Sequence, residues 1–399
     1  MKESAKWRSG RDLERVVAIL PSSRGGKSAD SLGDDEGVAA EDDGDVMVPT
    51  HEGPTVANPG LSLALTRRIG GDWVSDLGAL RRLHDVAGDS GFLLELAQVK
   101  RENKQRLAAH VKELLGVELS SEAMFIVQIK RMHEYKRQLL NCLYLISEYQ
   151  RCRSLHREQV QQGPLPSRVF IFAGKAAPGY LRAKLIIKLI NEVAAVVNAD
   201  SRVQHELRAV LLPNYDVSLA ELILPAADLS VQISLAGTEA SGTGNMKLMM
   251  NGALTIGTRD GANIEIEEAV GSAACFSFGL RTEEVVELRR AGYDPSSSIA
   301  KSPRLRSAIE LIESGLFAPN EPGIFKELLD SLRHADPYLI CADFEAYAEA
   351  QEQAARRYQQ PDAWQRDSLA NIAQSGAFSS DRAIRQYADE IWAVSSVRV

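Results

Sequence analysis

Apolar residues recur along this chain with two different periods, which predict helices in some stretches and buried strands in others. Over residues 58–116 they lie three and four positions apart, as at Leu61, Leu65 and Ile69. This spacing is typical of helices that pack through one face. We therefore expect residues 58–116 to form helices whose role is packing.

Short apolar runs further along predict strands that are buried on both faces. They occupy residues 124–129, 168–173, 207–212, 253–257 and 275–278. Helical patterns follow the first run, around Leu139 and Leu143, and the second, over residues 180–197. Strands that alternate with helices favour a parallel sheet, with ligands bound outside the carboxyl ends of its strands.

The pattern changes again after the strands. From Thr282 onward it predicts only helices, the last of them over residues 380–394. Together these patterns predict an α/β fold, a Rossmann-like parallel sheet flanked by helices, with an extra helical C-terminus.

Residues 1–57 differ from the rest in composition. Eight acidic residues lie between Asp30 and Asp45 among Gly, Ala and Ser, with little apolar surface to bury, so we expect disorder. Residues 16–28 imitate a strand followed by a Walker A loop. Pro21 replaces the first glycine, however, and its fixed φ and missing N–H suit a phosphate cradle poorly. We expect neither a nucleotide site nor a signal peptide here.

Composition narrows the classes of function. Of the 399 residues 45% are hydrophobic and the net charge is −8, which indicates a soluble globular protein and argues against nucleic acid or a membrane as partner. The four cysteines show neither paired spacing nor a metal-ligand pattern with His, so we expect a reducing, cytoplasmic location and no metal. They are Cys142, Cys152, Cys275 and Cys341.

The most informative stretch for chemistry is glycine-rich, residues 237–247. Gly242, Thr243 and Gly244 can bring backbone N–H groups together, and residues 245–251 predict a helix whose first amides would point at a bound anion. Lys247 lies one turn into that helix, and helical side chains lean toward the N-terminus. Its amine could therefore reach a point beside the anion.

Two cofactor classes could use this arrangement. A nucleotide P-loop is disfavoured, because Asn245 and Met246 separate the last glycine from Lys247 and Leu248 follows it. Pyridoxal phosphate fits better, since Lys247 could form a Schiff base with its aldehyde while the helix start holds its phosphate. A third interpretation remains open, in which the glycines only form a turn before a helix.

A second basic cluster follows the first predicted strand. Lys130, Arg131, Lys136 and Arg137 lie where this class of fold binds ligands. The alternative is a solvated helix start. Cations at a helix N-terminus oppose the helix dipole unless an anion lies between them, which favours an anion site.

Two long segments resemble the α-glucan (glycogen or starch) phosphorylases. Residues 237–266, GTEASGTGNMKLMMNGALTIGTRDGANIEI, are similar to the family's cofactor-lysine segment, and residues 127–141, VQIKRMHEYKRQLLN, to another family motif. The similarity continues from Asn58 (NPGLSLALTRRIG) to Trp392 (SSDRAIRQYADEIW). It implies the C-terminal domain of a two-domain glycosyltransferase of the GT-B type, with pyridoxal 5'-phosphate as cofactor.

The resemblance also implies roles for individual residues in binding phosphate. Lys247 would carry the cofactor, Lys130 would approach its phosphate, and Thr243 and Gly244 would bind that phosphate. Arg131 and Lys136 would hold the substrate phosphate beside it. The implied catalytic set is Lys247, Lys130, Arg131, Lys136 and Thr243.

Further roles concern the ring and the sugar. Tyr215 would flank the pyridine ring of the cofactor, and Tyr135 would line the glucose site. Glu239, Ser241 and Gly242 would hydrogen-bond the glucosyl hydroxyls. The implied reaction is reversible phosphorolysis of an α-1,4-glucan by orthophosphate, giving glucose 1-phosphate.

This chain departs from the family pattern in two ways. Family members usually have Arg where this chain has Asp216, and we predict a modest effect of that charge reversal on phosphate retention. The resemblance covers only the C-terminal half of the family's chain, whereas the implied active site lies between two halves. We therefore expect a truncated form with little activity alone, lacking most of the surface through which the family forms homodimers.

Two other readings stay open at this stage. The chain could be a phosphorylase fragment that binds pyridoxal phosphate without catalysis. It could instead be a nucleotide-sugar glycosyltransferase, which would bind a nucleotide diphosphate at the start of the 245–251 helix.

Overall fold

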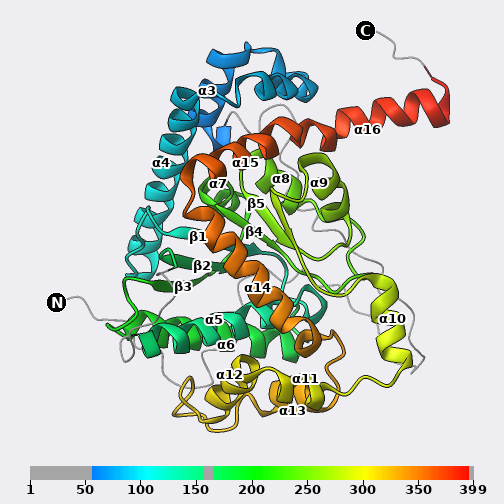
Figure 1. The fold of residues 1–399 in the computed structure, drawn as a ribbon. Coiled ribbons are helices and arrows are strands. Elements are labelled where there is room, and N and C mark those ends of the chain that lie inside the picture. The colour runs from blue at the N-terminus through cyan, green and yellow to red at the C-terminus, as the bar shows by residue number, and fades with distance from the viewer. Residues whose placement is uncertain (1–55, 156–164, 395–399) are drawn as a thin grey trace, which may run out of the picture.

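A six-stranded parallel sheet forms the centre of the protein, as seen in a computed structural model that describes residues 56–155 and 165–394 (Figure 1). The strand order is β3-β2-β1-β4-β5-β6, and all five pairings are parallel. This confirms the predicted α/β class. The strands are β1 (Met124–Ile129), β2 (Arg168–Ala173), β3 (Leu207–Leu212), β4 (Leu229–Gln232), β5 (Leu254–Gly257) and β6 (Cys275–Ser277).

Side chains alternate across the sheet and build a core on each face. Met124 and Ile126 of β1 join the core under α5 (Gln138–Leu155) and α6 (Leu181–Ala199). Phe125 and Val127 point the other way, into a core shared with α4 (Ser90–Leu115), α7 (Val217–Ala226) and α8 (Gly244–Met250). Burial of each large apolar side chain stabilises the fold by about 1.5–3 kcal/mol.

A third core joins the first part of the described chain to a helix near its end. It lies between α3 (Pro59–Ile69), the start of α4, and α15 (Pro361–Gln374). Asn58 begins α3 by accepting the backbone N–H of Leu61, and Pro59 takes the first helical position. The predicted packing role of residues 58–116 is thus confirmed.

One segment of that region has a different helical form. Leu77–Val86 is a 3-10 helix, and a shorter one spans Asp72–Val74. Leu77, Leu80, Leu83 and Val86 are strictly three residues apart. That spacing matches the three residues per turn of a 3-10 helix, so its leucines stay on one side.

The region from residue 282 onward is helical, as the sequence predicts. It contains α10 (Thr282–Arg290), α11 (Pro295–Lys301), α12 (Pro303–Glu313), α13 (Lys326–His334), α14 (Ile340–Tyr358), α15 and α16 (Ser380–Tyr387). A π-helical turn, Ala388–Trp392, replaces the last part of the predicted final helix. Figure 1 shows α16 extending away from the body of the molecule. In the described ranges, no helix is both long enough and apolar enough to cross a bilayer.

Strand β4 is absent from the sequence prediction, yet it decides where a ligand can bind. Because β4 pairs with β1, the chain turns to opposite sides of the sheet after these two neighbours. Parallel sheets of this order open a crevice at such a switch point, outside the carboxyl ends of the strands. Helix α9 (Ala262–Val270) follows β5 at the same end.

Candidate functional site

The loops that follow β1 and β4 meet at the switch point. The backbone N–H of Leu235 donates to the carbonyl of Tyr135 at 3.0 Å, which ties the two loops together. The loop after β2 supports them from the other side, because a Cβ built on Gly174 would lie 2.0 Å from the Lys130 carbonyl oxygen. Only glycine can occupy that position, and its backbone fixes where Lys130 begins.

Two buried lysines share one carboxylate at this point. The Lys130 ammonium lies 3.5 Å from Glu239 Oε2, and the Lys136 ammonium lies 3.2 Å from Oε1. The Ser234 hydroxyl also donates to Glu239 Oε2, at 2.6 Å. Lys130 is 7% exposed and Lys136 4%, which excludes the solvated helix start as an interpretation of these two residues.

The charges of the two lysines dominate the titration of Glu239. Burial opposes its ionisation, but the ammonium groups of Lys130 and Lys136 and the Ser234 hydrogen bond hold the pKa of this carboxyl below its ordinary value of 4.5. The carboxylate therefore stays ionised at neutral pH. It marks the position where two cations converge on an anionic group.

This pairing predicts a specific loss of stability in acid. Because the pKa of Glu239 is lower in the folded protein than in the unfolded chain, its stabilisation is present above the unfolded pKa and is lost as the pH falls through the folded one. We expect the difference in unfolding free energy between wild type and Glu239→Gln to be full at pH 7, to shrink as the pH falls below about 4.5, and to disappear only below the lowered pKa of the folded protein. Urea titrations from pH 7 to pH 3 measure it. A difference that grows in acid would contradict the pairing.

The rest of the loop after β1 surrounds Lys136. The Lys136 ammonium lies 4.9 Å from the centre of the Tyr135 ring, within the range of a cation–π interaction. The His133 ring lies 5.5 Å from the Tyr135 ring in a tilted arrangement and 5.5 Å from the Tyr180 ring in an edge-to-face one, measured between ring centres. The half-buried Arg131 follows Lys130, and its carbonyl accepts the Gln138 side chain at 2.9 Å. Tyr135 and Arg131 thus lie on the same loop as the lysines.

Arg137 does not belong with the basic cluster in which the sequence analysis placed it. It is fully buried, pairs with Asp343 of α14 at 2.7 Å, and donates through Nε to the Ile233 carbonyl at 2.7 Å. The spacing along the sequence put it beside Lys136. A left-handed backbone at Arg137, with φ of +56°, turns its side chain into the core instead.

The loop that carries Glu239 is held by the loop after β5. Asp260 Oδ2 accepts the backbone N–H groups of Thr238 at 3.1 Å and Glu239 at 2.8 Å. Gly261, with φ of +52°, lies directly beneath, and a Cβ there would meet the Ser241 carbonyl oxygen at 2.7 Å. These two residues fix the path of residues 238–241 and so the position of the Glu239 carboxylate.

Removing the Asp260 carboxylate should loosen this loop. In Asp260→Ala the two amides lose a charged acceptor, and we expect about 2–3 kcal/mol lower stability. Because Glu239 then leaves the lysines, the acid-sensitive stabilisation described above should also shrink. Denaturant unfolding at pH 7 and pH 4 measures both effects. Asp260→Asn is the matched variant, since its amide oxygen still accepts a hydrogen bond and should retain part of the stability.

Helix α8 starts at Gly244, one residue before the predicted helix start, and carries Lys247. Thr243 is its N-cap and makes no side-chain capping hydrogen bond. Gly242 precedes it with φ of +81°, a left-handed conformation that favours glycine. The adjoining Ser241 is exposed, while Gly242, Thr243, Gly244 and Lys247 are half-buried.

The far end of α8 is anchored by polar contacts. The Asn251 amide donates to the Lys247 carbonyl at 2.9 Å, and the Asn58 amide donates to the Asn251 side chain at 2.9 Å. The Lys100 ammonium donates to the carbonyl of Asn251 at 2.9 Å and to that of Ala227 at 2.6 Å. Helix α8 is therefore fixed to α3, α4 and the end of α7, which gives Lys247 a rigid base.

Tyr215 and Asp216 lie at the start of α7. Tyr215 is half-buried and packs against the core that contains Leu248, the neighbour of Lys247. Asp216 is exposed and caps α7, because its side chain accepts the Leu219 N–H at 2.9 Å. The Asp216 carboxylate thus has a local structural role.

This capping role predicts what Arg at position 216 would do. Asp216→Arg removes the cap and should lower the stability by about 1 kcal/mol, with little change in affinity for pyridoxal phosphate. Thermal unfolding and cofactor titration test both parts, with Asp216→Asn as the variant that keeps the cap. A large gain in cofactor affinity would show instead that the acidic residue impairs the site.

Sequence reasoning missed Ser234 and Asp260, which position Glu239. Both follow the carboxyl end of a strand, β4 and β5 respectively. The polar segment after the predicted strand 253–257 was a usable signal for Asp260, three residues beyond the end of that strand. No comparable signal existed for Ser234, because β4 was not recognised.

Comparison with known proteins identifies the family of this chain. The carbohydrate phosphorylase family matches residues 55–394. The chain is 48% identical over 343 residues to the muscle form of glycogen phosphorylase from Mus musculus and from Homo sapiens, covering 86% of this chain and 40% of each relative. It is 48% identical over 339 residues to the human liver form, covering 85% of this chain and 39% of that protein. The chain thus spans about two fifths of the length of these relatives, and it belongs to the carbohydrate phosphorylase family.

Proposed function

We propose that this chain is the pyridoxal phosphate-binding part of an α-1,4-glucan phosphorylase. The observation that carries the proposal is the convergence of buried Lys130 and Lys136 on one carboxylate, on the loop that leads directly into the helix of Lys247. Such a site can gather phosphate groups next to a primary amine. The relatives named above are glycogen phosphorylases.

The donor set suits pyridoxal phosphate. Lys247 supplies an amine for the aldehyde, and the residues before it, Thr243 and Gly244, supply a hydroxyl and backbone N–H groups for the phosphate. Lys130 adds a buried positive charge at the switch point. Tyr215 offers an aromatic ring on the side of the core shared with Leu248. Pyridoxal phosphate, when bound, supplies a phosphate with a second pKa near 6, which can hold and return a proton.

The residues of this chain would act mainly by holding charge. Arg131 and Lys136 bind orthophosphate. Lys130 offsets the repulsion between orthophosphate and the phosphate of the cofactor, so that the two phosphates can lie close together. Orthophosphate protonates the departing glycosidic oxygen. The oxocarbenium-like sugar then bonds to an oxygen of that phosphate, which gives glucose 1-phosphate with retention. Tyr135, Glu239, Ser241 and Gly242 orient the glucosyl unit for this reaction.

A complementation assay tests the activity. We expect the 399-residue chain with pyridoxal phosphate to form little or no glucose 1-phosphate from glycogen and orthophosphate. Addition of the separately produced N-terminal part of a related glycogen phosphorylase should raise the rate, because about three fifths of each relative's length lies outside the match. Robust turnover by the chain alone would contradict this expectation. No turnover with the added part, despite bound cofactor, would favour a non-catalytic binding protein.

A titration separates this function from that of a nucleotide-sugar glycosyltransferase. A phosphorylase should bind one molecule of pyridoxal phosphate per chain and should not bind uridine diphosphate. The reverse preference would favour the glycosyltransferase.

A further inference from the structure

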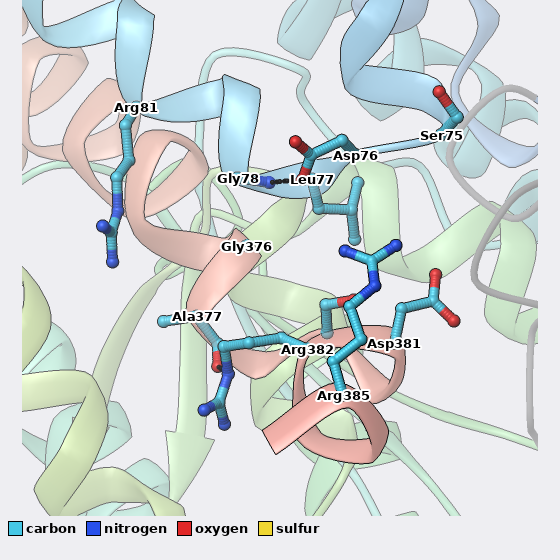
Figure 2. A pocket seen from close by; sticks show the side chains of 11 residues that line it. Ser75, Asp76, Leu77, Gly78, Arg81, Gly376, Ala377, Asp381, Arg382 and Arg385 are labelled. Carbon is cyan, nitrogen blue, oxygen red and sulfur yellow. Dashed lines mark hydrogen bonds between the residues drawn. The ribbon is translucent and has the colours of Figure 1, made fainter. Parts of the chain in front are cut away.

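A pocket lies at the N-terminal end of α16, formed by segments that the proposed function does not use. It has a volume of about 190 Å³ and lies between the 3-10 helix Leu77–Val86, the turn Ser375–Phe378 and α16. Figure 2 shows Arg81 on one wall and Arg382 and Arg385 on the other. Three arginines from two elements therefore line one small cavity.

These arginines have no carboxylate partner among the residues that the structure describes. Arg382 donates only to neutral acceptors, the Ala377 carbonyl and the Gln386 side chain, both at 2.6 Å. Arg81 and Arg385 have neither a hydrogen bond nor an ion pair within residues 56–155 and 165–394. The adjacent Arg82 differs, since it pairs with Asp72 at 3.2 Å. A lining with three arginines that lack an ion-pair partner within the described part of the chain, against two carboxylates, favours an anion.

The largely buried residue Ser379 adds an independent observation. Ser379 lines the pocket and is 8% exposed, yet its hydroxyl makes no hydrogen bond to any described residue. It is the N-cap of α16, whose eight residues begin at Ser380, and it makes no side-chain capping bond. The first amides of a helix lack acceptors within the helix, so hydroxyl and amides together offer donors to a ligand.

The floor of the pocket is rigid. A Cβ on Gly376 would lie 2.2 Å from the Leu77 carbonyl oxygen, so the turn and the 3-10 helix touch through their backbones. Asp76 is one of two carboxylates at the pocket, and it already accepts the Gly78 N–H at 3.0 Å. The other is Asp381, so the lining carries three positive and two negative side chains.

From this geometry we propose that the pocket binds a small phosphorylated anion. A phosphate group offers several acceptor oxygens, which match guanidinium groups arriving from two directions and the Ser379 hydroxyl. The cavity is smaller than the 300–1,000 Å³ typical of drug-sized ligands, and Leu77 and Ala377 are its main apolar residues, which excludes a bulky apolar ligand.

Binding has a structural consequence for α16. None of the residues of α16 is buried, so apolar packing does not fix this helix against the body of the molecule. An anion held by Arg81 on one wall and by Arg382 and Arg385 on the other links the two elements. We expect a bound anion to slow hydrogen exchange of the backbone amides of α16.

Pyrophosphate titration of the complete 399-residue chain tests the proposal. Calorimetry at low salt should detect binding that Arg81→Gln/Arg385→Gln weakens at least tenfold, while exchange over residues 380–387 slows with pyrophosphate in wild type and not in the variant. Arg82→Gln is the matched control, because Arg82 is next to Arg81 and does not line the pocket. It should bind as wild type does. The substituted arginines are exposed, so both variants should fold.

The phosphate site of the proposed function must be distinguished from this one. Lys136→Gln should weaken any binding at the switch point and leave the slowing of exchange in α16 intact. If Arg81→Gln/Arg385→Gln binds pyrophosphate as wild type does, or if pyrophosphate leaves the exchange of α16 unchanged, the pocket is not an anion site. Either result leaves the function proposed for Lys247 untouched, because that function is tested by cofactor attachment.

Discussion

Lys247→Ala is expected to abolish covalent attachment of pyridoxal phosphate to this chain. Wild type mixed with the cofactor should turn yellow, and borohydride should fix one cofactor per chain onto the peptide that contains Lys247. The variant should lose this label completely, because Lys247 is the residue that places an amine one turn into the helix after the glycine-rich loop. Absorbance spectra and peptide mass spectrometry measure the outcome.

The structure explains why this lysine should react selectively. Lys247 is half-buried on α8, a helix anchored at its far end through Asn251 to Asn58 and Lys100. The fixed base limits the directions in which the amine can point, which favours one reaction geometry. An exposed lysine would instead react slowly and without preference.

A matched control separates this from general lysine chemistry. Lys184 on α6 is also half-buried, and Lys184→Ala should keep the full label. If the label persists in Lys247→Ala, then Lys247 is not the attachment site and the proposed function is contradicted at its central residue. Loss of label in both variants would point to a folding defect, which circular dichroism detects.

Arg137→Ala is expected to lower the unfolding free energy by about 3–5 kcal/mol, the largest stability effect predicted for this protein. The guanidinium and its partner Asp343 are both almost fully buried, at 0% and 2% side-chain exposure. Truncation leaves the Asp343 carboxylate buried without a cation, although it still accepts the Leu280 N–H at 3.0 Å. Urea unfolding of wild type and variant measures the difference.

The effect should extend to the candidate site. Arg137 also donates to the Ile233 carbonyl at the end of β4, and it directly follows Lys136 in the chain. Its loss frees the segment that places Lys136 opposite Glu239. We therefore expect the pH-dependent stabilisation from Glu239 to weaken in the same variant.

A surface pair and a double variant serve as controls. Arg333 pairs with Glu313 at 2.6 Å with both side chains substantially exposed, so Arg333→Ala should cost at most about 1 kcal/mol. Arg137→Met/Asp343→Leu removes both charges and should recover part of the loss, because no buried charge remains. Equal losses in Arg137→Ala and Arg333→Ala would show that burial does not decide the cost.

The sequence by itself determined the class of fold and the segments that carry chemistry. Continuous apolar runs such as β1 and β2 are short and buried on both faces, so they stand out from the helical spacing around them and were predictable. The α8 helix was predicted to within one residue, because Gly242 precedes it and Gly244 begins it. These features depend on local geometry, which a linear pattern records.

Only the tertiary structure decided which of these segments meet. Strand β4 has four residues, too few for a clear period, yet it sits next to β1 and brings Glu239 between Lys130 and Lys136. Arg137 and Lys136 are neighbours in sequence and carry the same charge. The left-handed backbone at Arg137 directs the Arg137 side chain into the core, whereas the Lys136 side chain points to the site. Strand order and the direction of a side chain after a turn depend on contacts between residues far apart in the chain, and no local pattern encodes them.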